Sequence, residues 1–311
     1  MIENRYPLIL NPNARSEKGK RALAFIMKNA AKFAIYATRD EAEAEELARS
    51  FAEKKTPVVV AAGGDGTLNA ALRGLIGSET ALGIMPTGTM NVFAREMGVP
   101  TDHLDEALRV IEDGFVKNVD VFTVNGAPFL QMAGVGFDAH VIEETSRENK
   151  KLFGPLAYLA SAIKVLGEKP PRMKVICAGG ETTEGVCLLV GNGTLYGGQF
   201  ALFQDASNAD ELLDVVVFKE AGYRFMLDSL GGLARGGVGK DFPSDSVDYL
   251  QVASVKVECE QALPVEIDGE LWGRSKEISF DRSEHKLRVL APRIPSKNRW
   301  SEMIKTLTPW R

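Results

Sequence analysis

The run VVVAAGGDGTLNAALRGL at residues 58–75 constrains this chain more than any other segment. Its unbroken apolar start is typical of a strand buried in a parallel sheet, and the glycines then lead into a helical segment. Gly63, Gly64 and Gly66 permit positive φ and let backbone N–H groups approach an anion, to which the helix presents its positive end. We therefore predict a phosphate site in this turn, with a plain β-turn and helix cap as the alternative.

Asp65 lies in the middle of this turn. A carboxylate beside a triphosphate repels it unless a divalent cation lies between them, and Mg²⁺ is the cation that usually bridges carboxylates and phosphates. The turn therefore predicts magnesium as well as a phosphorylated ligand.

A second turn repeats this arrangement in LGIMPTGTMNVFARE at residues 82–96. Its Thr87, Thr89 and Asn91 are short polar side chains suited to phosphate or ribose. Turns on neighbouring parallel strands open on one crevice, which is the usual ligand position in an open α/β sheet. A generic turn is the alternative interpretation of P-T-G-T.

A third turn follows the first apolar run, in ILNPNARSEKGKRAL at residues 9–23. Lys18, Lys20 and Arg21 at the following helix start oppose the helix dipole, which a nearby anion would explain, although a solvated charge run is equally consistent. The chain has no GxxxxGK[ST] and no GxGxxG after this first strand, which argues against a P-loop enzyme and a nicotinamide dehydrogenase.

The alternation of β-rich and helical patterns through about the first 125 residues predicts an α/β domain with a doubly wound parallel sheet. Asp40 can cap a helix, with Glu43 three residues further on. The expected strands are Pro7–Leu10, Phe33–Ala37, Val58–Ala62 and Ala81–Met85.

Beyond Asn125 strand-like runs follow one another closely, which predicts a mainly antiparallel, β-rich domain. The expected strands are 175–178, 185–190, 212–218, 252–259, 265–267, 277–280 and 287–290, with helices at 153–166 and 223–234. We predict one domain at residues 1–124 and another at 125–291, with residues 292–311 packing back on the first.

Carboxylates recur at the ends of these expected strands, and their joint presence with the glycine turns suggests one site. They are Asp120, Asp138, Asp210, Asp214 and Asp268 with Glu270. The last two belong to I-D-G-E, and an Asp-Gly pair after a strand is also typical of a simple hairpin turn.

Composition excludes several classes of protein. With 37 basic and 42 acidic residues the net charge is −5, which gives no reason to expect a nucleic-acid partner. No run of about 20 apolar residues could span a membrane, and the first residues lack a signal-peptide pattern, so we expect a cytoplasmic protein. The three cysteines form no CxxC pair and lie in apolar runs, which favours buried thiols over a zinc site.

Five motifs occur in order along the chain: N-P-N-A-R, G-G-D-G-T-L-N, P-T-G-T-M-N-V-F-A-R, G-V-G-F-D-A and I-D-G-E. In them nearly the whole chain resembles the diacylglycerol kinase catalytic-domain family, which includes bacterial lipid kinases, sphingosine kinases and ceramide kinases. GGDGT is shared with NAD kinases, whereas PTGTMNVFAR and IDGE match the lipid-kinase branch. The resemblance implies an ATP-dependent lipid kinase whose nucleotide-binding α/β domain and β-rich domain meet at ATP and the lipid headgroup.

The resemblance also implies roles for individual residues. Asp268 or Glu270 would be the proton acceptor, Asp120 would support it, and Asp138 would contact the substrate. The nucleotide pocket would contain Asn11, Pro12, Asn13, Thr38, Gly63, Gly64, Asp65, Gly66, Thr67, Asn69, Gly88, Thr89 and Asn91.

Mg²⁺ is implied at Asp65 and at Asp210, whose segment resembles a structural magnesium site. Asp65 would either hold the metal or, as in sphingosine kinases, act on the acceptor hydroxyl. Two residues depart from the family pattern: Val92 stands where many members have aspartate, and Glu211 where the metal segment usually has glycine. Val92 bears on the identity of the lipid, and Glu211 on the presence of the metal.

The C-terminal segment suggests contact with a membrane surface. Trp300, Met303, Ile304 and Leu307 recur at helical spacing, and residues 293–311 carry five basic residues and one acidic residue, a net charge of +4. This predicts either a helix lying on anionic lipid at the inner face of the membrane or a helix docked on the first domain.

The sequence leaves the acceptor open between diacylglycerol, ceramide and a sphingoid base. Two other functions stay as alternatives: an NAD kinase-like enzyme acting on a soluble nucleotide, and a non-catalytic nucleotide-binding regulator. A homodimer is compatible with the chain but is not indicated by any motif.

Overall fold

The computed structural model describes residues 5–12, 17–136, 139, 170–198, 200–220 and 237–293. The described chain divides into two compact units. The first contains the residues up to Val119 and those from Lys286 on, and the second runs from Asp120 to His285. The predicted boundary at 124 moves to 119 because Phe122–Val124 pairs with a strand of the second unit, and the one at 291 moves to 285 because the strand Leu287–Leu290 joins the first unit.

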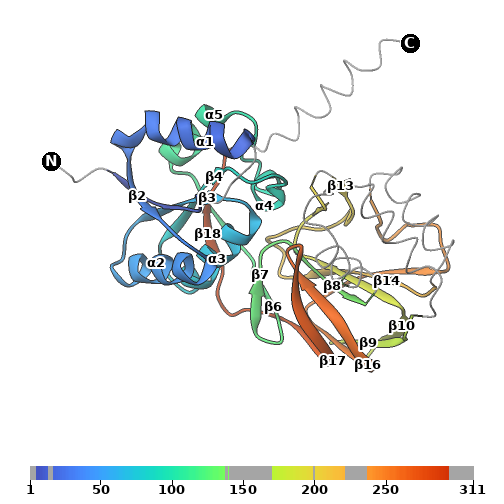
Figure 1. Ribbon diagram of the computed structural model, residues 1–311. Coiled ribbons are helices and arrows are strands. Elements are labelled where there is room, and N and C mark those ends of the chain that lie inside the picture. The colour runs from blue at the N-terminus through green and yellow to red at the C-terminus, as the bar shows by residue number, and fades with distance from the viewer. Residues whose placement is uncertain are drawn as a thin grey trace, which may run out of the picture. The chain divides into compact units, whose positions relative to one another are not determined.

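The first unit is a six-stranded sheet in the order β2-β1-β3-β4-β18-β5, with helices on both faces (Figure 1). All neighbouring strands are parallel except β18 and β5. The elements are β1 (Tyr6–Leu10), α1 (Glu17–Lys28), a 3-10 turn (Ala30–Lys32), β2 (Phe33–Ala37), α2 (Glu41–Glu53), β3 (Val58–Gly63), α3 (Asp65–Leu75), β4 (Ala81–Pro86), α4 (Val92–Glu96), α5 (Leu104–Asp113), β5 (Val116–Val119) and β18 (Leu287–Leu290).

Local sequence signals account for α2. The carboxylate of Asp40 accepts the N–H of Glu43 at 2.9 Å, which is the predicted N-terminal cap. Ala44, Ala48 and Phe51 are buried at helical spacing, so one face of the helix packs on the rest of the unit.

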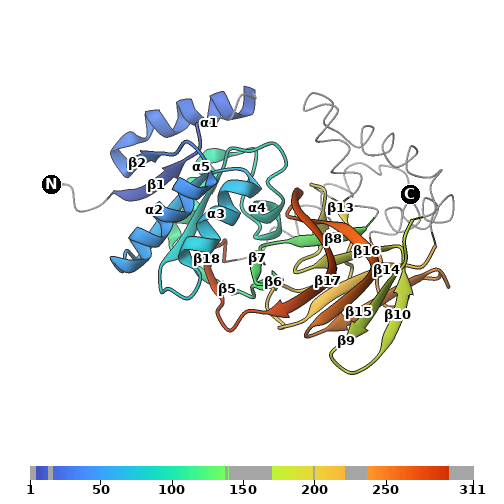
Figure 2. The ribbon, with the colours of Figure 1, turned by 60° about the horizontal axis from the view of Figure 1, so that its bottom comes forward.

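The second unit is built on an antiparallel sheet in the order β15-β14-β11-β8-β16-β17-β6-β7, with β9 pairing β16 and β10 pairing β9. Figure 2 shows β16 and β17 as a long hairpin beside the other strands. The strands are β6 (Phe122–Val124), β7 (Ala127–Phe129), β8 (Met132–Gly136), β9 (Met173–Cys177), β10 (Thr182–Gly185), β11 (Cys187–Gly191), β12 (Leu195–Tyr196), β13 (Phe200–Ala201), β14 (Leu213–Phe218), β15 (Val247–Val252), β16 (Val255–Ile267) and β17 (Glu270–Arg282).

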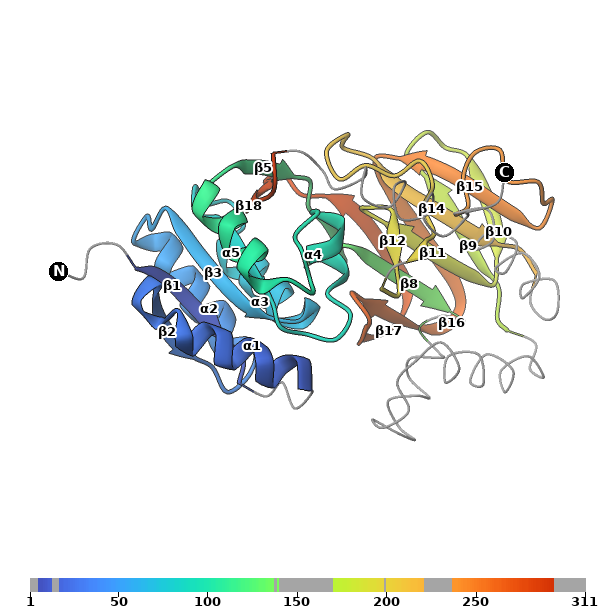
Figure 3. The ribbon, with the colours of Figure 1, turned by 90° about the horizontal axis from the view of Figure 1, so that it is seen from above.

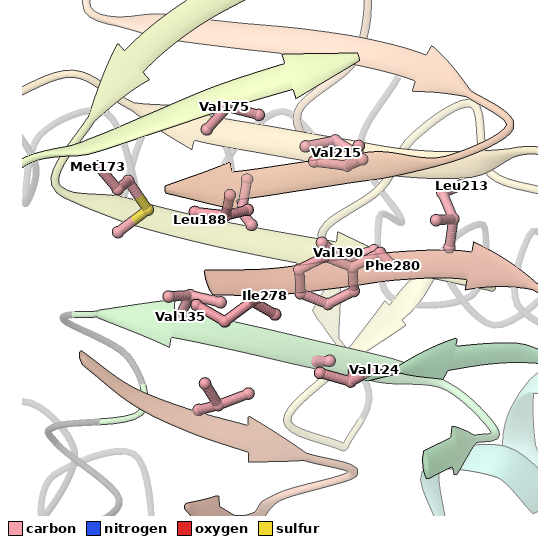
Figure 4. Packing of buried hydrophobic residues seen from close by; sticks show 14 of the residues in the cluster. Val124, Val135, Met173, Val175, Leu188, Val190, Leu213, Val215, Ile278 and Phe280 are labelled. Atoms are coloured by element: carbon pink, nitrogen blue, oxygen red, sulfur yellow. The ribbon is translucent and has the colours of Figure 1, made fainter. Parts of the chain in front are cut away.

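The core of this unit is formed by alternate side chains of strands that are distant in sequence (Figure 4). Val135, Leu188, Val215 and Phe280, for example, are all completely buried and belong to four different strands. Cys177 and Cys187 are buried and lie in no disulfide, as predicted, whereas Cys259 is half-buried.

The strand at 287–290 was predicted for the β-rich domain, and that assignment is wrong. Figure 3 shows β18 beside β5, and Leu287 pairs with Val119 while Val289 pairs with Leu82 of β4. A short apolar run is equally suited to either core, so its sequence does not specify the sheet it joins.

Several other expected strands are also revised. The run 252–259 is interrupted between β15 and β16, the run 185–190 spans the end of β10 and most of β11, and 265–267 and 277–280 are parts of longer strands. The expected helices at 153–166 and 223–234, and residues 294–311, lie outside the described residues. Within the described part of the chain, no helix has the length and apolar character needed to cross a membrane.

Candidate functional site

In the first unit, the candidate site lies at the carboxyl ends of β1 and β3. The strand order reverses direction at this point, because β2 lies on one side of β1 while β3 and β4 lie on the other. Asn11, directly after β1, donates its backbone N–H to Ala62 O at 3.1 Å and its Nδ2 to Thr67 Oγ1 at 3.4 Å. Ligands of open α/β sheets bind at such switch points.

The glycines of the two turns serve close packing. A Cβ on Gly63 would lie 2.2 Å from Thr67 Oγ1, and one on Gly88 would lie 2.4 Å from Gly64 Cα. None of Gly63, Gly64, Gly66 or Gly88 has a positive φ. The freedom for positive φ is therefore not used at these glycines, and the missing side chain matters for close approach, of Gly63 to the Thr67 side chain and of Gly88 to the Gly64 backbone.

Asp65 joins the two turns. Its Oδ2 accepts the N–H of Val92 at 3.1 Å and its Oδ1 accepts that of Phe93 at 3.0 Å, so the carboxylate caps the start of α4. Asn91, at the N-cap position with φ of 51°, makes no side-chain cap of its own. Burial raises the pKa of Asp65, and the backbone donors oppose that rise.

Two buried polar atoms at these turns have no hydrogen-bond partner among the described residues: Thr87 Oγ1 and Asn91 Oδ1. Buried polar atoms in native proteins are nearly always satisfied, so such atoms point to a polar ligand. The amide nitrogen of the Asn91 side chain already has a partner, since Nδ2 donates to Gly88 O at 2.8 Å. A ribose hydroxyl fits both remaining atoms, because it can donate to Asn91 Oδ1 and can also pair with Thr87 Oγ1, whereas a phosphate oxygen could accept from Thr87 Oγ1 alone.

Other predicted nucleotide residues are used within the protein. Thr38 Oγ1 donates to Leu10 O at 3.3 Å, and Asn69 Oδ1 accepts from Arg73. Pro12 and Thr89 are exposed, and Asn13 lies outside the described residues.

The basic start of α1 is also partly accounted for within the protein. Lys18 Nζ lies 3.1 Å from Asp102 Oδ1, which gives this cation a protein counterion. Its proposed attraction to a ligand anion stays a prediction.

In the second unit, the site is centred on the turn between β16 and β17. Asp268 and Gly269 have φ of 50° and 87°, as a two-residue type I′ hairpin requires. The Asp268 carboxylate accepts the backbone N–H groups of Leu130, Gln131 and Met132 at 2.9, 2.9 and 3.1 Å. IDGE is thus a hairpin turn, and its aspartate also fastens the connection between β7 and β8.

The two carboxylates of IDGE therefore differ in availability. Asp268 is half-buried and holds backbone donors, whereas Glu270 begins β17 as an exposed residue. The fully buried Glu266 also stabilises this turn, since its Oε2 accepts the Gly269 N–H at 2.8 Å. Of the two predicted proton acceptors, Glu270 is thus the more exposed.

Asp120 is connected to the same turn through Asn192, which the sequence analysis missed. Asn192 Nδ2 donates to Asp120 O at 2.8 Å and to Leu130 O at 2.9 Å, beside the N–H that Asp268 accepts. Asp120 Oδ2 accepts the N–H of Glu211 at 2.8 Å. The signal for Asn192 was the G-N-G-T turn that follows the apolar strand β11.

In the part of the chain that the structure describes, neither predicted metal ligand belongs to a cluster of three or more metal-binding side chains. Asp210 is exposed and its Oδ1 accepts the N–H of Leu212 at 3.1 Å, while Asp65 belongs to the other unit. Among the described residues, no group of three or more His, Cys, Asp or Glu side chains could hold a metal ion. Glu211 has φ of 67°, which explains why glycine suits this position. Asp138 lies outside the described residues.

Comparison with known proteins identifies the family. Residues 5–124 match the diacylglycerol kinase catalytic domain, and residues 131–289 match the YegS C-terminal NAD kinase beta sandwich-like domain. A probable lipid kinase YegS-like protein of Chromohalobacter salexigens is 34% identical over 85% of this chain and 86% of its own length. The chain belongs to the diacylglycerol kinase-like family of lipid kinases.

Further relatives of this lipid kinase agree with that assignment. A diacylglycerol kinase of Bacillus subtilis is 27% identical over 86% of this chain and 90% of its own length. The crystal structure of a putative diacylglycerol kinase from Bacillus anthracis aligns with a TM-score of 0.75 and 26% identity, over 93% of this chain and 98% of that one. The predicted family, the predicted α/β and antiparallel β architecture, and the assignment as an enzyme are confirmed.

An NAD kinase from Archaeoglobus fulgidus, solved in complex with ATP, has a TM-score of 0.52 and 14% identity, over 96% of this chain and 98% of that one. At this identity the likeness shows a common fold.

Proposed function

We propose that this lipid kinase transfers the γ-phosphate of ATP to a hydroxyl of a membrane lipid, with diacylglycerol as the first acceptor to test. The observation that carries the proposal is the IDGE turn, in which Asp268 holds backbone N–H groups and Glu270 is left exposed. Phosphoryl transfer needs alignment, charge stabilisation and a carboxylate that receives the proton. Glu270 supplies the last of these.

In the proposed reaction the lipid hydroxyl oxygen attacks the γ-phosphorus of ATP. The bond to the bridging oxygen breaks, ADP leaves, and the hydroxyl proton passes to Glu270 as the new bond forms. Asp268 acts as a positioning residue, since it fixes the turn from which Glu270 extends. Asp120, tied to the same turn through Asn192, supports that arrangement.

ATP would bind at the carboxyl ends of β1, β3 and β4. Asn11 and Thr67 bridge the switch point, and Thr87 Oγ1 and Asn91 Oδ1 offer buried polar atoms to the nucleotide. We keep Asp210 as the candidate ligand of a structural Mg²⁺, and we assign a separate Mg²⁺ to the ATP phosphates, with Asp65 as its candidate ligand. Bound there, the ion would neutralise charge on the transferred phosphate.

The test is transfer of radiolabel from ATP to a panel of diacylglycerol, ceramide, sphingosine and NAD, with the product identified by mass. We expect label on a lipid. In Glu270→Gln the turnover should fall about 100-fold or more, while ATP affinity stays within a few-fold of wild type. Glu277→Gln, an exposed carboxylate on the same strand, is the matched control and should keep wild-type turnover.

Two results would contradict the proposal. Label on NAD and on no lipid would make the enzyme a soluble-nucleotide kinase. Wild-type turnover in Glu270→Gln would remove the proton acceptor assigned to this turn.

Such an enzyme would work in the cytoplasm, peripherally at the inner face of the membrane. The C-terminal segment predicted to bind lipid lies outside the described residues, so its contact with the membrane stays a prediction.

A further inference from the structure

Two large apolar side chains are exposed directly beside the IDGE turn. Leu271 is 40% exposed and Trp272 is 42% exposed, and they follow Glu270 on β17. In a regular strand successive side chains point to opposite faces. Here the register shifts, because Glu266 pairs with Leu271 whereas its neighbour Val265 pairs with Gly273. Trp272 is therefore the extra residue of a β-bulge, which redirects side chains.

A second hairpin brings another exposed aromatic residue to the same anchor. Phe200, on β13, is 43% exposed. Its partner strand β12 is attached at Leu195, whose carbonyl accepts Gln131 Nε2 at 3.0 Å. The backbone N–H of that same Gln131 is held by Asp268 at 2.9 Å. Phe200, Leu271 and Trp272, here called the apolar rim, thus belong to two hairpins fastened at one residue.

The chemistry of the apolar rim fits a lipid surface. Tryptophan has an amphipathic ring that favours the boundary between headgroups and acyl chains. Arg274 and Lys276 are exposed on β17 shortly after Trp272 and complement anionic headgroups. A protein partner or a second copy of the chain would also cover apolar side chains. The apolar rim, however, lies beside the exposed Glu270, the proposed proton acceptor for a lipid hydroxyl, and this favours a lipid bilayer.

We propose that the apolar rim inserts into the headgroup boundary of an anionic bilayer and so carries the IDGE turn to its acceptor. The choice of a bilayer as partner rests on the proposed lipid kinase function. The rim acts as a contact surface and takes no part in the phosphoryl transfer.

Trp272 allows a direct test in the full chain. In Trp300→Phe/Trp310→Phe it is the remaining tryptophan, so its fluorescence reports on this position alone. Vesicles of phosphatidylcholine with 30% phosphatidylglycerol are added at about 0.1 M salt, where anionic headgroups still attract nearby cations. We expect a blue shift of the emission and quenching by phosphatidylcholine brominated on its acyl chains. No shift and no quenching, with the protein sedimenting with the vesicles, would overturn the proposal.

Vesicle sedimentation of Leu271→Ser/Trp272→Ser provides the second measurement. We expect at least tenfold weaker partition than wild type, with an unchanged melting temperature. Phe115→Ser, 42% exposed in the first unit, is the matched control and should bind as wild type. Wild-type partition of the double variant would overturn the proposal, as would loss of a dimer by the double variant without loss of vesicle binding. Neither vesicle assay measures phosphorylation. A negative kinase assay would therefore reject the proposed function, while the vesicle assays would still decide whether the apolar rim binds a bilayer.

Discussion

Several aspartates of this kinase hold backbone N–H groups from segments far away in sequence. Asp65 caps α4, Asp268 fastens the β7–β8 connection, and Asp120 accepts from Glu211. Residues that were predicted for chemistry thus also join loops. Replacing them should change stability as well as activity, and the two effects can be separated by measurement.

Asp65→Asn tests this overlap. The amide has one acceptor oxygen, so either Val92 or Phe93 loses its partner and a buried N–H faces an NH₂ group. We expect the unfolding free energy to fall by about 1–3 kcal/mol, together with a large loss of turnover. Urea unfolding measures the first effect, with the exposed Asp113→Asn as control. Unchanged stability with abolished turnover would show that Asp65 has only the catalytic or metal-binding role expected from the sequence.

Asp214 predicts a pH dependence of stability. It is completely buried, its Oδ1 accepts from Tyr249 and Gln251, and burial raises its pKa to about 6. The unfolded value is about 3.9, so the folded state keeps a proton that the unfolded chain releases. This stabilisation is complete below about pH 4 and is lost as the pH rises through about 6.

The variant Asp214→Asn removes that titration. Relative to wild type, the variant should gain about 1 kcal/mol of unfolding free energy on going from pH 5 to pH 7.5. Urea unfolding at the two pH values measures the difference, and Asp245→Asn, an exposed carboxylate, should show none of it. A constant difference between wild type and Asp214→Asn would show that the carboxyl keeps an ordinary pKa.

At the scale of elements, the β16–β17 hairpin determines where Glu270 lies. Gly269 has φ of 87° with no atom near an added Cβ, whereas Gly273 on the following strand has equal space and no positive φ. Gly269→Ala should therefore cost about 1 kcal/mol through backbone strain alone and lower turnover, and Gly273→Ala should be close to neutral. Equal melting temperatures and turnover for the two variants would show that the turn conformation is unimportant.

At the scale of the whole molecule, β18 links the end of the described chain to the first sheet. It lies between β4 and β5, so a fragment of residues 1–119 lacks an internal strand. Leu287 pairs directly with Val119, which allows residues 120–286 to be replaced by Asn-Gly as a type I′ hairpin.

We expect this closed fragment, ending at residue 293, to unfold cooperatively, and residues 1–119 alone to unfold at a lower temperature or to aggregate. Circular dichroism on heating compares the two fragments. The continuous second unit, residues 120–285, should show its own cooperative transition. Identical melting of the two first-unit fragments would mean that β18 adds little to that sheet.

Local interactions made part of this protein predictable from its sequence. The strands β1 to β4, the Asp40 cap of α2 and the hairpin at Asp268-Gly269 each depend on residues a few positions apart, whose periodicity and turn preferences can be recognised directly. The motifs around them were sufficient to indicate the lipid-kinase family.

Only the tertiary structure decided which distant segments meet. The hydrogen bonds of Asp268 to Leu130 and of Asn192 to Asp120 span 138 and 72 residues. The pairing of β18 with β5 joins the two segments of the first unit that come before and after the second unit in the sequence. No local pattern encodes such pairings, because a carboxylate or a short apolar strand is compatible with many partners until the chain has collapsed. That is why the sequence indicated both Asp268 and Glu270 as proton acceptors, and the fold distinguished the one that holds the turn from the one that is exposed.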